Sequence, residues 1–193
     1  FETAVKGIRN QNDLAQESSE IADFWSMLQG FQTSGKCIEK AHYRIRYMKS
    51  FRPLSVKEDI EFKEARPILY LNTAAVASLF NSRNAGSTSN RSNWSTIMSY
   101  LKSHASYLGL KQDRFTILLP SGLPDYTIDI VNCEQVKKVK VNRPKALCFD
   151  YLQLKETFGL DLETEVVAEV QDMQEEVITE MQHTFKQNEF DFT

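Results

Sequence analysis

The 193-residue chain has 41% hydrophobic residues, only 7 Gly and 5 Pro, and a formal net charge of −3. This composition excludes collagen-like, low-complexity and intrinsically disordered chains, and it allows one domain, or one domain with appendages, around a buried core. No apolar run approaches the ~20 residues of a membrane-spanning helix, and no secretory signal is visible, so we expect no membrane association.

Charge is distributed unevenly along the chain. Residues 1–160 contain 22 Lys and Arg against 16 Asp and Glu, whereas residues 161–193 contain only Lys186 against 10 acids. A basic body with an acidic tail is typical of proteins that contact nucleic acid. Because the chain begins at Phe1, we interpret it as a piece of a longer polypeptide.

Cysteine usage favours a reducing compartment. The three cysteines, Cys37, Cys133 and Cys148, are widely spaced and odd in number. Neither a disulfide framework nor a zinc knuckle follows from this spacing. We therefore expect reduced thiols and a cytoplasmic location.

Residues 1–66 predict an N-terminal extension made of a helix and a basic strand. Asp13 can cap the helix, with Gln16 reaching back, and Gly30 and Gly35 are the expected stop. A basic strand face can contact phosphates, although such a face is more often simply solvated. In the strand over residues 42–47, strict alternation places Tyr43, Ile45 and Tyr47 on one face and Arg44 and Arg46 on the other.

Residues 67–160 predict a strand, two helices, a strand and a hairpin, in that order. Thr73 is the expected cap of the first helix, which ends at Arg83, and a polar loop over residues 84–90 follows. This order is that of a winged helix, a helix-turn-helix followed by a β-hairpin wing. We therefore predict an α+β fold with a winged-helix-like core. The second helix carries an apolar stripe of Trp94, Ile97, Met98, Leu101, Ala105 and Leu108, with Gly109 as its stop. Strands are expected at 68–71, 114–119, 126–131, 136–141 and 146–149, and a last helix from Asp150 to Gly159.

A winged helix contacts DNA through its second helix and its wing. Here the exposed helix residues are short polar groups and cations, and the wing ends in five cations within nine residues. Such groups donate hydrogen bonds to base edges and phosphate oxygens. The hypothesis requires that the two stretches form one positive surface. The predicted DNA-binding residues are Arg91, Asn93, Ser95, Thr96, Ser99 and Lys102 on the helix, and Lys137, Lys138, Lys140, Arg143 and Lys145 on the wing.

The alternative hypothesis is a protein-interaction or oligomerisation module that does not bind nucleic acid. Residues 161–193 predict an acidic amphipathic helix whose apolar stripe runs from Leu162 to Phe185. Such a helix needs a surface to pack on, either a protein partner or a second copy of the chain. Winged helices also bind proteins, and lysines on strands can serve to protect sheet edges.

Enzymatic activity is the weakest interpretation. Residues 30–36 fit G-x4-G-K, but the match follows a helix and lacks the Ser or Thr that holds magnesium. His42, His104 and His183 stand in no catalytic or metal-binding spacing. We expect no catalytic residue, no metal site and no cofactor in this chain.

Four segments together carry a resemblance to a known family. They are NDLAQESSEIADFW (12–25), RPILYLN (66–72), NRSNWST (90–96) and VNRPKAL (141–147). With them, most of residues 1–160 resembles the C-terminal region of primase/helicase proteins carried by mobile elements in Bacteroides-type bacteria. In that family the ATPase and primase parts lie upstream. The resemblance implies a helicase-associated, DNA-binding accessory role in replication of a mobile element, without catalysis in this chain.

Overall fold

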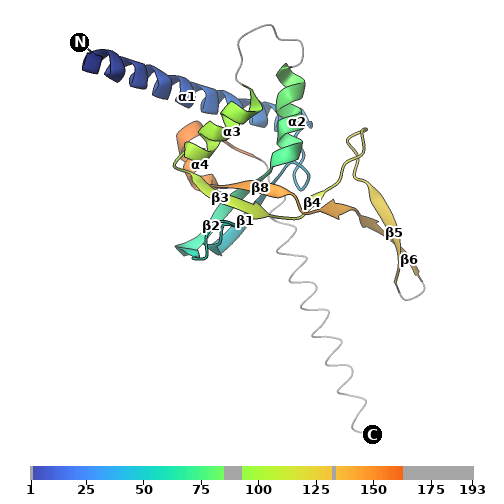
Figure 1. Ribbon diagram of the computed structural model, residues 1–193. Helices are drawn as coiled ribbons and strands as arrows, with labels where there is room; N and C mark the ends of the chain where they lie inside the picture. The colour runs from blue at the N-terminus through green and yellow to red at the C-terminus, as the bar shows by residue number, and fades with distance from the viewer. Residues whose placement is uncertain (1, 85–92, 132–133, 163–193) are drawn as a thin grey trace. The chain divides into compact units, whose positions relative to one another are not determined.

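The computed structural model describes residues 2–84, 93–131 and 134–162, and Figure 1 shows their arrangement. Residues 1–162 form one compact unit. Its helices and antiparallel sheets confirm the predicted α+β class. The helices are α1 (Glu2–Thr33), α2 (Thr73–Asn84), α3 (Trp94–Ser103) and α4 (Tyr151–Phe158), and the strands are β1 (Tyr43–Phe51), β2 (Ile60–Asn72), β3 (Tyr107–Gln112), β4 (Phe115–Thr116), β5 (Tyr126–Val131), β6 (Glu134–Val139), β7 (Val141–Asn142) and β8 (Lys145–Asp150).

A four-stranded antiparallel sheet with the strand order β1-β2-β8-β3 forms the centre of the unit. Residues 67–72 of β2 and 146–150 of β8 are all buried, because both central strands are covered on their two faces. Leu69 lies opposite Ile45 of β1 and opposite Phe149 of β8. Residues directly opposite in antiparallel strands point to the same face, so these three share one side of the sheet.

Helices cover that side of the sheet (Figure 1). Trp25 of α1 is buried, and its ring packs edge-on against Phe149 at a centroid distance of 5.2 Å. Phe24 contacts the rings of Phe80 on α2 and Trp94 at the start of α3. This aromatic cluster joins α1 to residues after position 67 in a single core.

α1 is longer than its sequence signals predict. The helix begins at Glu2, so the predicted start at Asp13 is wrong. Gln16 donates to Glu20 Oε1 at 2.9 Å instead of reaching back to close a capping box. A residue can cap only where the chain before it is not helical, and here the helix already exists. The predicted stop is confirmed at Gly35, which has φ 71° and follows the last helical residue, Thr33; Gly30, the other predicted stop, lies inside the helix.

The predicted helix over residues 73–83 is confirmed as α2, but its cap is one residue earlier. Asn72 Oδ1 accepts from the backbone N–H of Ala75 at 3.4 Å. The Thr73 hydroxyl instead donates to the carbonyl of Lys145 at 2.9 Å, and so ties the start of α2 to β8.

α3 ends earlier than the apolar periodicity predicts. Ile97 and Leu101 are buried as expected, but the helix ends at Ser103 and not at Gly109. Leu108, which the periodicity places on the helix, lies in β3. The backbone of these residues pairs with β8, with a bulge between Tyr107 and Gly109. Sheet pairing therefore overrides a helical pattern of side chains.

The predicted hairpin is confirmed as β5 and β6, with Tyr126 opposite Val139. The order of elements also follows the winged-helix prediction, but the pairing differs from a simple wing. β3 pairs with β8 in the four-stranded sheet, whereas β5 and β6 form a two-stranded sheet of their own. Residues 85–92, between α2 and α3, lie outside the described part. The winged-helix core therefore stays a prediction.

The predicted acidic helix over residues 161–193, with its partner surface at 162–185, falls outside the described residues from position 163 onward. No helix in the described ranges is both long enough and apolar enough to cross a bilayer.

Gly109 lies in β3 at the point where this strand approaches Pro53 of the β1–β2 loop. We expect Gly109→Ala to destabilise the fold by about 1–3 kcal/mol. Gly109 has φ +133°, and an added Cβ would lie 2.7 Å from Pro53 Cβ. The matched control is Gly30→Ala in α1, where nothing lies within 4 Å of the new Cβ. This control should stabilise by about 0.5–1 kcal/mol, because Ala is the better helix former. Urea unfolding measures both; equal stability of Gly109→Ala and wild type would contradict the close approach.

Candidate functional site

The side of the sheet that faces away from the helices has its own smaller core. Phe51, Ile68, Tyr70, Phe115, Ala146 and Cys148 form it, and Met48, Phe62 and Leu108 pack against it. In the described part of the chain, all of these residues lie in strands and none lies in a helix. Polar side chains can therefore surround the small core.

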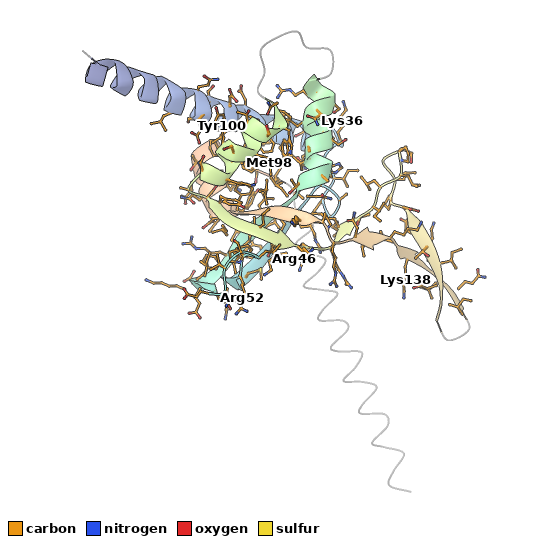
Figure 2. All side chains as sticks on the ribbon, viewed as in Figure 1. Lys36, Arg46, Arg52, Met98, Tyr100 and Lys138 are labelled. Carbon is orange, nitrogen blue, oxygen red and sulfur yellow. The ribbon has the colours of Figure 1, made fainter. Side chains whose placement is uncertain are left out.

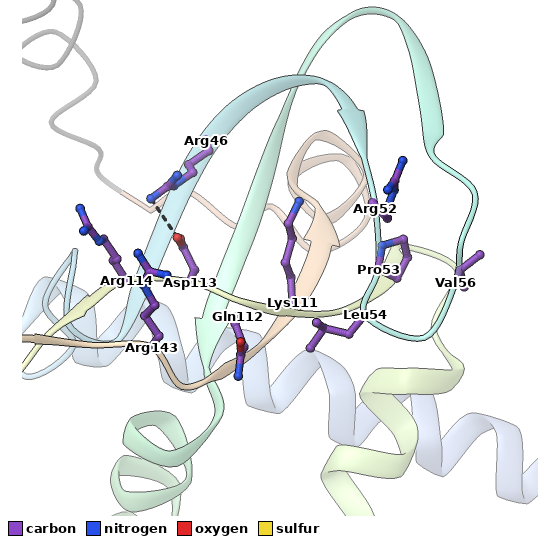
Figure 3. A pocket seen from close by; sticks show the side chains of 10 residues that line it. All are labelled: Arg46, Arg52, Pro53, Leu54, Val56, Lys111, Gln112, Asp113, Arg114 and Arg143. Atoms are coloured by element: carbon purple, nitrogen blue, oxygen red, sulfur yellow. Dashed lines mark ion pairs between the residues drawn. The ribbon is translucent and has the colours of Figure 1, made fainter.

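A cleft of about 870 Å³ lies on this side of the sheet (Figure 3). Its lining contains five cationic side chains and one carboxylate. Figure 3 shows Arg46, Arg114 and Arg143 grouped around Asp113, with Lys111 in the middle and Arg52 at the other end. The lining residues are Arg46, Arg52, Pro53, Leu54, Val56, Lys111, Gln112, Asp113, Arg114 and Arg143.

Strand register brings these cations together from separate parts of the sequence. Arg46 lies opposite Ile68, and Lys111 lies opposite Ala146, so both face the smaller core. The β1–β2 loop is tied to β3 by the N–H of Leu54, which donates to the carbonyl of Leu110 at 2.8 Å. This bond places the loop beside β3, and Arg52 at the loop's start thereby lines the same cleft as Lys111.

Two of the five cations have carboxylate partners. Arg46 pairs with Asp113 at 2.9 Å, and Arg52 pairs with the exposed Asp59. The hydrogen bond from Arg52 lowers the pKa of Asp59 below its ordinary value, so Asp59 stays charged.

Lys111, Arg114 and Arg143 are different. Among the residues that the structure describes, no carboxylate forms an ion pair with any of these three. Arg114 and Arg143 are exposed, and Lys111 is half-buried. The charge of Lys111 is partly balanced by Asp59, whose pKa it helps to lower. Among the described residues, the lining thus carries a net positive charge that is most accessible at Arg114 and Arg143.

The Arg46–Asp113 pair is only partly satisfied. Arg46 Nε and Asp113 Oδ2 are both buried and have no hydrogen-bond partner within the described residues. The Asp113 side chain is 11% exposed, against 39% for Arg46. A buried polar atom without a partner is costly, so this pair is a strained part of the lining.

Two of the cations lie over buried aromatic rings. Arg46 lies over the ring of Tyr70 at 5.9 Å, and Lys111 lies over the ring of Phe51 at 5.1 Å. Both rings are buried, with exposures of 2% and 0%, and burial raises the pKa of Tyr70. These rings can orient the charged groups, but a base could not stack on them.

Some of the predicted recognition-helix residues cap α3, and others are exposed to solvent. Asn93 Oδ1 accepts from the Thr96 N–H at 2.9 Å and from the Ser95 hydroxyl, so these three side chains close the start of α3. Ser99 and Lys102 are exposed. Arg91 lies outside the described residues.

The predicted wing residues occupy two different surroundings. On the hairpin, Lys138 pairs with Asp129 at 3.1 Å, and Lys137 lies over the ring of Tyr126 at 4.1 Å. Arg143, by contrast, lines the basic cleft. The remaining two wing residues are Lys140, which pairs with Asp125 at 2.9 Å, and Lys145, which is exposed at the start of β8.

The helix and wing residues do not gather into one positive surface. α3 packs with α1, α2 and β3 in the main core, whereas the hairpin lysines belong to a separate sheet. Figure 2 shows Met98 and Tyr100 of α3 far from Lys138 of β6. Of the predicted residues that the structure describes, Arg143 lines the cleft and the others do not.

Sequence reasoning missed Arg52, Lys111 and Arg114 as site residues. Alternation along β1 did place Arg46 on a basic strand face, which is the local signal that pointed toward this cleft. The positions of Arg52, Lys111 and Arg114 in the cleft depend on the pairing of β3 with β8 and on the course of the β1–β2 loop. Neither leaves a short-range pattern in the sequence.

Comparison with protein-family models, with curated proteins and with solved structures finds no match. The functional argument therefore rests on the geometry and the charge of the cleft.

Proposed function

We propose that this chain binds nucleic acid, with the basic cleft holding phosphate groups of the backbone. The observation that carries the proposal is that Arg114 and Arg143, which form no ion pair with a described carboxylate, line one cleft together with Lys111. Cations that neutralise backbone phosphates release condensed counterions, and this release supplies most of the affinity of sequence-independent binding. Guanidinium groups suit the task because their fork of donors matches phosphate oxygens.

A polymer fits the cleft better than a small phosphate ligand does. The cations follow one another along the cleft from Arg143 to Arg52, as charges spaced along a backbone require (Figure 3). A small anion is typically held by a helix N-terminus or a glycine-rich loop, and the lining contains neither. It also contains no aromatic side chain on which a base could stack. We therefore propose contacts that position the backbone and read little sequence.

Within this proposal the chain is a DNA-binding accessory domain. The resemblance of residues 12–25, 66–72, 90–96 and 141–147 favours a place in a mobile-element replication protein of the primase/helicase type. A winged-helix mode, with α3 in the major groove and the hairpin as a wing, is the finer form of the proposal. It would use Lys102 and Lys138, whereas cleft binding uses Arg114 and Arg143, so charge variants separate the two modes.

A titration of fluorescently labelled DNA tests the proposal. We expect micromolar or tighter binding at low salt, with a logarithm of affinity that falls linearly against the logarithm of salt concentration. Duplex and single-stranded probes of the same length, each in two unrelated sequences, should be compared. Similar affinity for the two sequences is expected. Failure of both probe types to bind at low salt would overturn the proposal.

A further inference from the structure

The β5–β6 hairpin exposes apolar side chains along one strand. Tyr126, Ile128 and Ile130 of β5 alternate along the strand, so they share one face, and they are 42%, 65% and 77% exposed. Val139, opposite Tyr126, extends the same face and is 39% exposed. A two-stranded hairpin is marginally stable by itself in water, and a sheet of three or more strands with an apolar face is more stable. Additional strands at its edge would therefore stabilise this hairpin.

The two outer edges of the hairpin differ in charge. β6 carries Lys137 and Lys138, and Lys140 follows it directly, whereas β5 carries no lysine or arginine. Lysines on an outer strand oppose pairing with another chain. In the described part of the chain, β5 pairs with β6 alone, so its other edge is open along Tyr126–Val131. The β5 edge is thus the one that lacks protection.

From this asymmetry we infer that two copies of the chain associate by antiparallel pairing of β5 with β5, so that the two hairpins form one four-stranded sheet. The inference goes beyond the proposed DNA binding, since no residue of the basic cleft takes part. Like β5 and β6 themselves, two β5 strands related by a two-fold axis run antiparallel. Residues directly opposite each other in an antiparallel pair have their side chains on the same face of the sheet. The axis must therefore lie where a residue is opposite its own copy, and not where a residue is opposite the copy of its neighbour.

Charge selects the residue on the axis. An axis at Asp129 sets that carboxylate opposite its own copy, and an axis at Thr127 sets Asp125 opposite Asp129. Like charges directly opposite each other are destabilising. Axes at Tyr126 and at Ile130 avoid both clashes but pair few residues of β5, whereas an axis at Ile128 avoids them and pairs most of the strand. It pairs Ile128 with itself, Tyr126 with Ile130, and Thr127 with Asp129 as hydrogen-bond donor and acceptor.

This register also joins the apolar faces. The side chains of Tyr126, Ile128 and Ile130 from both copies would line one continuous surface across the two central strands, and aromatic and β-branched residues would face each other across the new pair. Such cross-strand pairs stabilise a sheet. Ile128 is the residue whose own copy lies nearest.

Sedimentation of the wild-type chain over a concentration series tests the inference, with Ile128→Lys and Ile128→Glu as the decisive variants. The wild type should sediment as a dimer, and each variant alone as a monomer of half the mass, because two like charges would meet on the axis. An equimolar mixture of the two variants should regain the dimer, since opposite charges then meet. A circular-dichroism melt of each variant checks folding. Position 128 lies opposite Lys137 of its own hairpin, so a lysine there weakens the hairpin itself, whereas a glutamate does not; Ile128→Glu is therefore the variant whose loss of the dimer reports on the axis contact.

Val136→Lys is the matched control on β6. Val136 is 37% exposed, and an axis of a β6–β6 pair at this residue would set no lysine opposite another. This variant should stay dimeric. A monomeric wild type, a dimer that survives Ile128→Lys, or a mixture that fails to re-form the dimer would each overturn the inference. Loss of the dimer in Val136→Lys together with its retention in Ile128→Lys would assign the contact to β6 instead.

Discussion

The double variant Arg114→Gln/Arg143→Gln is expected to bind DNA roughly tenfold more weakly for each side chain removed. Both side chains are exposed and have no carboxylate partner among the described residues, so their charge is available to phosphates. A hydrogen bond to a charged group contributes about 1.5–3 kcal/mol, and about 1.4 kcal/mol corresponds to a tenfold change in affinity. Each phosphate that the variant no longer neutralises keeps its condensed counterion, so the salt slope should fall by about 0.9 per substituted arginine on duplex DNA.

Variants elsewhere on the surface control for the loss of net charge. Lys102→Gln on α3 and Lys138→Gln on β6 each remove one cation, and neither residue lines the cleft. If the cleft binds the phosphates, both should retain near wild-type affinity and salt slope. Asp113→Asn should act in the opposite direction, because it removes the one carboxylate of the lining. Weaker binding by Lys102→Gln and Lys138→Gln, with no effect of Arg114 and Arg143, would favour the winged-helix mode.

The measurement requires that these variants fold. Arg114 and Arg143 lie at the surface, and substitutions at such positions usually change stability by no more than about 0.5 kcal/mol. The backbone carbonyl of Arg114 accepts a hydrogen bond from the Arg44 side chain at 3.0 Å. A Gln at position 114 keeps that carbonyl. Urea unfolding of each variant beside the titrations separates weaker phosphate binding from partial unfolding.

Local signals in the sequence predicted much of the secondary structure. Alternation identified β1, in which Tyr43 and Ile45 are buried, although Tyr47 is 59% exposed. Asp150 caps α4 by accepting from the Gln153 N–H at 3.3 Å, and Gly159 ends this helix with φ 64°. Each of these features depends on residues within four positions of one another, which is the range over which a single sequence is informative.

Features that depend on distant pairing could not be predicted in the same way. β8 is the central partner of both β2 and β3, yet its sequence indicates only a short strand. The pairing of Lys111 with Ala146 determines on which face of the sheet the Lys111 side chain lies. The pairing of β3 with β8 also places Leu108 in a strand instead of in the predicted helix. The basic cleft exists because of this register. A prediction that sums charge along the sequence therefore placed the positive surface on the hairpin, where Lys138 and Lys140 are neutralised by Asp129 and Asp125.

A separate prediction concerns how much a core residue contributes to stability. Phe149→Ala is expected to lower the free energy of unfolding by about 3–5 kcal/mol, because Phe149 is fully buried and removal of its ring would leave a cavity. Its ring contacts Trp25 at 5.2 Å and Tyr107 at 5.6 Å, so the substitution also removes ring contacts that pack α1 and Tyr107 against the centre of the sheet. Leu152→Ala is the matched control; Leu152 is 44% exposed, and the change should cost about 0.5 kcal/mol or less.

A double-mutant cycle shows whether Phe149 joins α1 to the sheet in the manner that the structure indicates. If the edge-on contact between Trp25 and Phe149 stabilises the fold, the loss in Trp25→Leu/Phe149→Leu should be smaller than the sum of the two single losses by about 0.5–1.5 kcal/mol. Leucine is used in the cycle because it keeps much of the buried volume and limits collapse of the site. Additive losses in urea unfolding would mean that the two rings stabilise the protein independently, and the packing of α1 on β8 would need a different explanation.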